Sequence, residues 1–152
     1  KDSMSKFRVY FVGEGSLLET LKKKAKDMRL DKQVVFYGNI SDFQKISVVI
    51  RGADWLVIPS RSDSIPLVFS EAMKCATPVV ASNLPDLKCL IKKYKVGYLF
   101  DKGDFRNLAS IIRKLPNSSE HRNMFSKNTK LAAIDFSIEN SSERLMSYLN
   151  KL

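Results

Sequence analysis

The segment IPSRSDSIPLVFSEAM, residues 58–73, is the part of this sequence around which the rest of the chain is organised. The apolar residues 55–58 predict a short buried strand, which ends at Pro59. Pro66 then suits the first turn of a helix, where the missing N–H of proline costs no hydrogen bond. The candidate N-cap residues are the small polar residues before it, Ser62, Asp63 and Ser64. The segment therefore predicts a strand, a polar loop and a helix whose N-terminus faces that loop.

A helix N-terminus beside a polar loop can bind an anion, because its first N–H groups are free and the helix dipole is positive there. Asp63 lies in the loop and Glu71 lies a turn or more into the helix, so the expected phosphate-sized site has a carboxylate on each side. Spacing alone leaves three roles open for these acids: an acid/base pair, hydrogen-bond acceptors for a ligand, or solvated charges. Lys74, three residues after Glu71 on the same helix face, fits the last of these.

Strand-like segments alternate with helical ones along the chain, which predicts right-handed β-α-β units and an α/β fold with a parallel sheet. The predicted strands are residues 7–12, 34–37, 55–58, 79–82 and 96–100. The predicted helices are about 16–30, 41–52, 66–75, 83–91, 104–115, 120–133 and 138–149. Ligands of such sheets bind beyond the carboxyl ends of the strands. We therefore expect one ligand rim, formed by residues 13–15, 38–39, 59–64 and 82–83.

The length of 152 residues fits a single domain, 1–152, and the net charge of +10 favours polyanions, anionic lipid surfaces or phosphorylated ligands. Solvated helix faces are the competing explanation for the lysines. Aromatic residues do not alternate with basic ones as in a platform for single-stranded nucleic acid, so no nucleic-acid partner is expected. Cys75 and Cys89 fall in predicted helices. We interpret them as reduced residues in or near the core of a cytosolic protein, with a disulfide as the less favoured alternative.

Metal and nucleophilic chemistry find little support in the sequence. The one histidine, His121, falls in a polar helix and is expected at the surface. This leaves no metal cluster and no Ser-His-Asp or Cys-His set, so neither a metal nor a cofactor is expected. Gly13 and Gly15 lack the third glycine of a dinucleotide fingerprint, because Leu18 stands in its place. The two glycines fit either a tight turn or a close approach of the backbone to a ligand.

Residues 59–82, PSRSDSIPLVFSEAMKCATPVVAS, resemble the donor-binding core of the retaining GT-B glycosyltransferases of family 4 (glycosyl transferases group 1). The shared pattern is two acids separated by seven residues, a proline-containing turn before an apolar helix, Glu-Ala-Met, and a Pro-Val-Val-Ala strand. Residues 12–15, 35–38 and 96–99 match further glycine-turn and strand elements of the family. The resemblance covers about residues 7–115. It implies a Rossmann-like, three-layer C-terminal half of such an enzyme, which binds a nucleotide-sugar.

The resemblance also implies roles for individual residues. Asp63 would contact the donor sugar and Glu71 the ribose hydroxyls, and these two acids are the expected catalytic residues. Backbone N–H groups at the helix start would hold the diphosphate, while Asn39 and Ile40 would lie against the base. The implied donor-binding residues are Gly13, Gly15, Asn39, Ile40, Arg61, Ser64, Ile65, Leu67, Val68 and Glu71.

Some features of the family are expected to be missing from this chain. The arginine and lysine that neutralise the diphosphate normally lie on a strand-loop-helix segment before residue 7, which residues 1–6 do not supply. Arg61 is a candidate substitute. The acceptor-binding N-terminal domain is also absent, so the chain is expected to show little turnover alone. Asp63 replaces the usual glutamate, and Ala76 replaces a common glycine.

The function implied is that of a retaining, metal-independent glycosyltransferase in polysaccharide or glycolipid synthesis, with a UDP- or GDP-sugar as the expected donor. Two alternatives stay open: a non-catalytic nucleotide-sugar-binding module that regulates a partner, and half of a nucleotide-sugar epimerase. The expected location is the cytoplasm, with peripheral attachment to the inner face of an anionic membrane.

Overall fold

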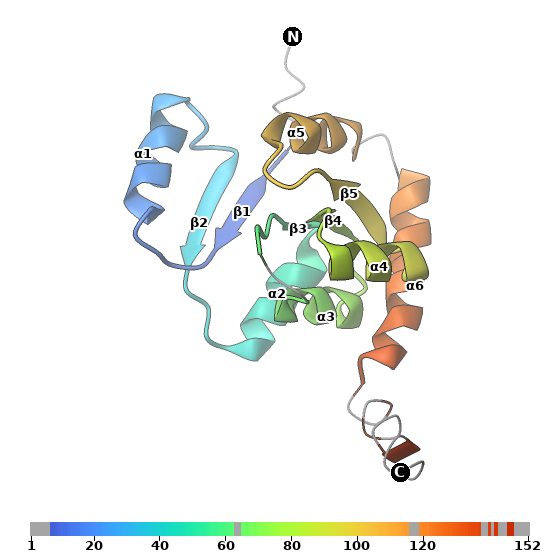
Figure 1. Cartoon of the computed structure of the whole chain (residues 1–152). Helices are drawn as coiled ribbons and strands as arrows, with labels where there is room; N and C mark the ends of the chain where they lie inside the picture. The colour runs from blue at the N-terminus through green and yellow to red at the C-terminus, as the bar shows by residue number, and fades with distance from the viewer. Residues whose placement is uncertain are drawn as a thin grey trace. The chain divides into compact units, whose positions relative to one another are not determined.

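The computed structural model describes residues 7–62, 65–115 and 119–137, and the single positions 140, 142, 146 and 147. The chain forms two compact units, Lys1–Ile46 (unit 1) and Ser47–Leu152 (unit 2). The boundary falls inside helix α2 (Phe43–Gly52). Strands and helices alternate through both units, as the sequence predicts (Figure 1). Whether the chain is one domain stays a prediction.

Unit 1 contains two parallel strands, β1 (Val9–Val12) and β2 (Val34–Gly38), with helix α1 (Leu18–Asp27) between them in the sequence. These strands are rich in aromatic and β-branched residues, which favour a pleated surface. Aromatic rings stack across the pair: Phe11 on the opposite Phe36 and Tyr10 on the diagonal Tyr37, with centroid distances of 5.2 Å and 5.6 Å. Such cross-strand contacts stabilise the pairing and fix its register.

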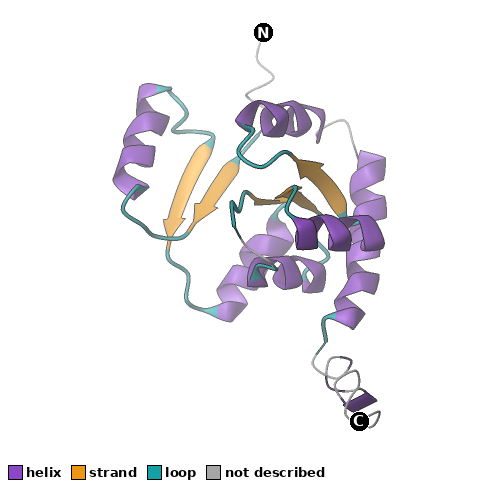
Figure 2. Cartoon of the chain, viewed as in Figure 1, coloured by secondary structure: helices purple, strands orange, loops and turns teal. Residues whose placement is uncertain are grey.

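Unit 2 contains a parallel sheet with the strand order β3 (Leu56–Ile58), β4 (Val79–Ser82), β5 (Gly97–Phe100). All residues of β4 are buried, because this strand is central, with a hydrogen-bonded neighbour on each side, and helices cover both faces of a parallel sheet. Figure 2 shows how helices accompany these strands. They are α3 (Leu67–Lys74), α4 (Pro85–Tyr94), α5 (Phe105–Lys114) and α6 (Ser119–Asp135). The described strands thus form two parallel sheets, where the sequence analysis expected one.

The core of unit 2 holds α3 in place. Phe69 and Met73 of α3 are fully buried, as is Leu87 of α4. Each such side chain contributes roughly 1.5–3 kcal/mol through burial. The ring of Phe69 also meets the ring of Phe136 edge to face, with centroids 5.7 Å apart. The helix that follows the polar loop is therefore firmly anchored along its apolar face.

The start of α3 differs from the prediction. Pro66 is not in the first turn but is itself the N-cap, with an extended ψ of 140°, and the helix begins at Leu67. Ser62 therefore does not cap the helix; it lies four positions before Pro66. The helix starts at Leu67 because the backbone at Pro66 is still extended. The hydrogen bond from the Phe69 N–H to the Pro66 carbonyl, at 2.9 Å, closes the turn at this end of the helix.

Two further predictions meet the structure with mixed results. Cys75 is buried, as expected, but Cys89 is exposed on α4, so its assignment to the core region was wrong. Both thiols are free, which overturns the disulfide alternative. The predicted helix 138–149 lies mostly outside the described residues.

Candidate functional site

The carboxyl end of β3 leads into the loop for which the sequence predicts a ligand. Pro59 and Arg61 are exposed there, and Ile65 is 44% exposed just before the helix. Asp63 and Ser64 lie outside the described residues, so the roles predicted for both stay predictions. The structure defines the two elements that flank this loop, β3 before it and α3 after it.

The N-terminus of α3 is open to solvent. No described side chain caps it, and Leu67 at its first position is 83% exposed. The first N–H groups of a helix have no partner within the helix, and they carry the positive end of its dipole. The amides of Leu67 and Val68 are therefore suited to an anionic ligand. The amide of Phe69 already donates to the Pro66 carbonyl.

Glu71 lies farther along the same helix, about 6 Å along the axis from Leu67 at 1.5 Å per residue. Its side chain is half-buried, between the fully buried Phe69 and Ala72 in the sequence. Among the described residues no cation pairs with it, and Lys74 stays exposed and separate. A half-buried carboxylate without an ionic partner can still accept hydrogen bonds, whereas a simple solvated pair with Lys74 is not observed.

Unit 1 has two short loops at the carboxyl ends of its own strands. Gly13 has a φ of +134° and donates its N–H to the carbonyl of Gly38 at 2.7 Å. Its backbone amide is thus already bonded to the last residue of β2. Gly15 is exposed, with no atom within 4 Å of where a Cβ would stand. Asn39 is exposed and Ile40 is half-buried.

Glu14 is a residue that the sequence analysis did not single out. One of its carboxylate oxygens accepts the backbone N–H of Asn39 at 3.4 Å and also lies 3.6 Å from the position of a Cβ on Gly38. Glu14 therefore helps to hold the loop after β2 in place. The only signal in the sequence was an acid between two glycines.

The other titratable groups of interest belong to unit 2. His121 is exposed on α6, as predicted, with its Nδ1 2.6 Å from the hydroxyl of Tyr98. A hydrogen bond to the Tyr94 hydroxyl raises the pKa of Lys93 on α4. In the described part of the chain, no three His, Cys, Asp or Glu side chains gather as metal ligands. A cavity of unit 2 lies at the opposite edge of its sheet, beside Thr77 and Pro78.

The sequence profile described as "Glycosyl transferases group 1" matches residues 1–132. The chain belongs to this family. The sulfoquinovosyl transferase SQD2 of Arabidopsis thaliana is 31% identical over 129 residues, which cover 83% of this chain and 24% of the relative. The UDP-Gal:alpha-D-GlcNAc-diphosphoundecaprenol alpha-1,3-galactosyltransferase of Escherichia coli is 30% identical over 122 residues, covering 78% and 30%. The chain thus spans less than a third of the length of either relative.

Solved structures show the same fold. HepE of Anabaena in complex with UDP matches with a TM-score of 0.82 at 21% identity, over 96% of this chain and 41% of that one. The C-terminal domain of the glycosyl transferase group 1 protein LpcC of Francisella tularensis matches with a TM-score of 0.77 at 25% identity, over 90% and 73%. The prediction of an α/β, GT-B glycosyltransferase fold is therefore confirmed.

Proposed function

We propose that this chain is the donor-binding part of a retaining, metal-independent glycosyltransferase that uses a nucleotide-sugar. Family membership and the HepE structures, which hold UDP or UDP-glucose, support a nucleotide-sugar donor. The observation that carries the proposal is the open start of α3, followed about one turn later by a half-buried acid that forms no ion pair with a described residue. This arrangement offers main-chain donors to a diphosphate and a carboxylate to a neighbouring hydroxylated ring.

The main chemical requirement of the proposed reaction is to stabilise the leaving diphosphate, and the start of α3 is suited to this. When a bond between a sugar and a diphosphate breaks, negative charge develops on the departing phosphate. The amides of Leu67 and Val68 and the dipole of α3 would stabilise that charge without a metal. The Glu71 carboxylate would accept hydrogen bonds from both ribose hydroxyls. Asp63 would contact the sugar, and the loops at Gly13, Gly15, Asn39 and Ile40 would approach the nucleotide.

Calorimetric titration of the chain with UDP-glucose and with GDP-mannose tests this proposal. Replacing Glu71 by Gln keeps the size of the side chain but removes the charge, so Glu71→Gln should weaken binding by about 5- to 150-fold, as expected for about 1–3 kcal/mol. The matched control is Glu120→Gln, an exposed acid in the first turn of α6. Failure of both sugars to bind, or equal affinities for the two variants, would refute the ribose assignment.

The activity of the whole protein forms the second half of the proposal. We expect little sugar transfer by this chain alone and full transfer only when an acceptor-binding domain is supplied. NMR of the product would show whether the anomeric configuration of the donor is kept. No described helix is long and apolar enough to cross a bilayer. Cytoplasmic location and peripheral attachment to an anionic membrane stay part of the proposal.

A further inference from the structure

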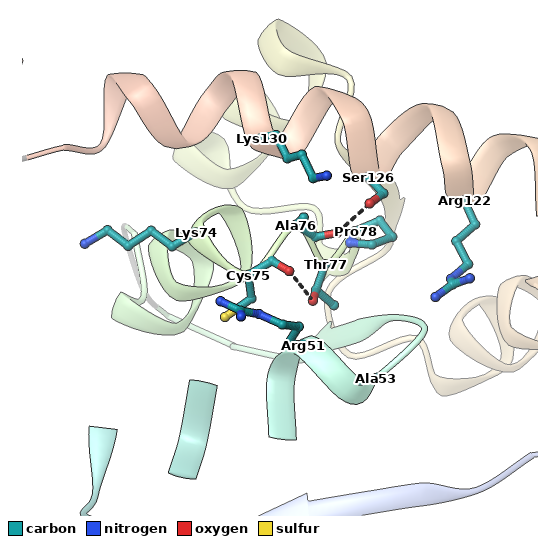
Figure 3. A pocket seen from close by; sticks show the side chains of 10 residues that line it. All are labelled: Arg51, Ala53, Lys74, Cys75, Ala76, Thr77, Pro78, Arg122, Ser126 and Lys130. Atoms are coloured by element: carbon teal, nitrogen blue, oxygen red, sulfur yellow. Dashed lines mark hydrogen bonds between the residues drawn. The ribbon is translucent and has the colours of Figure 1, made fainter. Parts of the chain in front are cut away.

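The amino-terminal edge of the sheet in unit 2 carries a cavity that the proposed donor site does not use. Its volume is about 450 Å³, which is within the range of sites for small ligands. Its floor is the loop Ala76–Pro78, between the end of α3 and the start of β4 (Figure 3). The donor site is expected at the start of α3, so the two sites would lie at opposite ends of that helix.

The floor of the cavity is well defined by hydrogen bonds. The Thr77 hydroxyl is buried and donates to the carbonyl of Ile50 at 2.8 Å. The Ser126 hydroxyl of α6 donates to the carbonyl of Ala76 at 2.8 Å. These bonds tie the loop to α2 on one side and to α6 on the other. The polar groups of the floor are thus satisfied within the protein, and the charge of the cavity comes from its walls.

Basic side chains from three helices form those walls. They are Arg51 at the end of α2, Lys74 at the end of α3, and Arg122 and Lys130 of α6. In Figure 3, Arg122 and Lys130 extend from α6 toward the loop, Arg51 comes from below, and Lys74 extends outward from its helix end. Arg122 is paired with Asp54 at 3.1 Å. The other three cations have no ion pair with a described residue.

Helix dipoles explain only part of this positive charge. The C-termini of α2 and α3 each contribute about half a negative elementary charge, which Arg51 and Lys74 complement. Lys130 lies in the interior of α6, and Arg122 lies near the N-terminus of that helix, where a cation is disfavoured. When the four cations are counted against Asp54 and both helix ends, a surplus of about two positive charges surrounds the cavity, and one of the contributing charges is the outward-pointing Lys74.

We propose that this cavity binds a phosphate-bearing group with at least two negative charges, such as a phosphate monoester or a pyrophosphate. Arginine forms two parallel hydrogen bonds to phosphate oxygens, and lysine supplies a mobile point charge. Arg51 and Lys130 are the principal ligands, because neither forms an ion pair with a described residue and they reach the cavity from different helices. The site is distinct from the donor site and does not depend on it.

NMR titration of the ¹⁵N-labelled chain with inorganic pyrophosphate at low ionic strength tests the proposal. The amides of Ala76, Thr77 and Ser126 report the cavity, and the amide of Val68 reports the start of α3. If the proposed function failed, the amide of Val68 would not shift, whereas the amides of the cavity would still report binding there. The titration therefore tests the two sites separately. We expect the cavity amides to shift in a saturable manner.

The decisive comparison uses two double variants that remove the same charge. Arg51→Gln with Lys130→Gln should weaken pyrophosphate binding at the cavity amides about tenfold. Lys88→Gln with Lys92→Gln, on the exposed face of α4, should leave it within about twofold. Cosedimentation with phosphatidylcholine vesicles, with and without phosphatidic acid, whose headgroup is a phosphate monoester, identifies the source of the phosphate.

Binding only to vesicles with phosphatidic acid, lost in the cavity variant and kept in the control, would assign the site to a lipid headgroup. Shifts of the cavity amides with pyrophosphate, lost in the same variant, would assign it to a small phosphorylated molecule. Unshifted cavity amides together with no vesicle binding would overturn the proposal. Equal weakening in both double variants would overturn it too, because it would mean diffuse counterion attraction.

Discussion

Replacing Gly97 by alanine should destabilise unit 2 through a direct clash in its sheet. Gly97 opens β5 and pairs with Val79, a fully buried residue of the central strand β4. A Cβ at Gly97 would lie 1.9 Å from the carbonyl oxygen of Val79 and 2.8 Å from its carbonyl carbon. Ordinary contact begins at 3.4 Å, so the strands would have to separate by roughly 1.5 Å.

The magnitude follows from what that separation disturbs. Overpacking of a core costs typically about 1–3 kcal/mol. The N–H of Val79 donates to the Val96 carbonyl at 3.1 Å, and weakening each such bond costs about 0.5–1.5 kcal/mol. Alanine returns about 0.5–1 kcal/mol, because glycine loses more backbone entropy on folding. The free energy of unfolding should therefore fall by about 3 kcal/mol, a large part of the stability of a typical domain.

Urea unfolding followed by far-ultraviolet circular dichroism would measure this change. Gly97→Ala should lower the midpoint by about 1–2 M urea. Gly52→Ala is the matched control, since Gly52 ends α2 and nothing lies within 4 Å of its added Cβ. That control should keep or raise stability, by up to about 1 kcal/mol. If the two variants unfolded within about 0.5 kcal/mol of each other, the reasoning from strand contact would be refuted.

Two smaller changes test the helix ends. Ala76 follows α3 with a left-handed φ of 60°, a conformation that costs an L-residue about 1–2 kcal/mol. Ala76→Gly should therefore raise the free energy of unfolding by a few tenths to about 1 kcal/mol. The control variant Ala53→Gly should lower it. Thermal melts of both variants would check this, and a loss of stability in Ala76→Gly would contradict it. The Asp104 carboxylate caps α5 by accepting the backbone N–H groups of Arg106 and Asn107, both at 2.9 Å. Asp104→Ala should therefore lower the free energy of unfolding by about 1 kcal/mol. The control variant Asp101→Ala, at an exposed position, should lower it much less. Similar urea midpoints for these two would show that the cap contributes little.

The sequence predicted most of the elements because their signals are local. The apolar run before Pro59 and the run at 79–82 form strands of one sheet, as predicted. A short apolar run rich in β-branched residues is typical of a buried strand. The helix predicted from residue 104 begins at Phe105, and Asp104 is its N-cap, through local hydrogen bonds that span only two or three residues. The order and type of elements, and hence the fold, could be read this way.

What the sequence did not reveal depends on contacts between distant residues. The need for glycine at position 97 comes from the carbonyl of Val79 on the neighbouring strand. The basic cavity is assembled from α2, α3 and α6, whose cations are far apart in the sequence. Pro66 could equally be an N-cap or a first-turn residue, because its fixed φ suits both and only ψ decides. The ligand roles of Asp63 and Glu71 stay predictions.

Trp55, the single tryptophan of the chain, gives unit 2 a fluorescent probe of its own. Its indole stacks on Tyr98 of β5 and meets Phe125 of α6 edge to face, with centroids 5.5 Å and 6.0 Å away. Its emission will therefore change when these three elements separate, whereas unit 1 contains only tyrosine and phenylalanine as emitters. Recording tryptophan emission and ellipticity on one sample would reveal whether the two units unfold in one cooperative transition. A difference between the two midpoints would measure the difference in stability between the units.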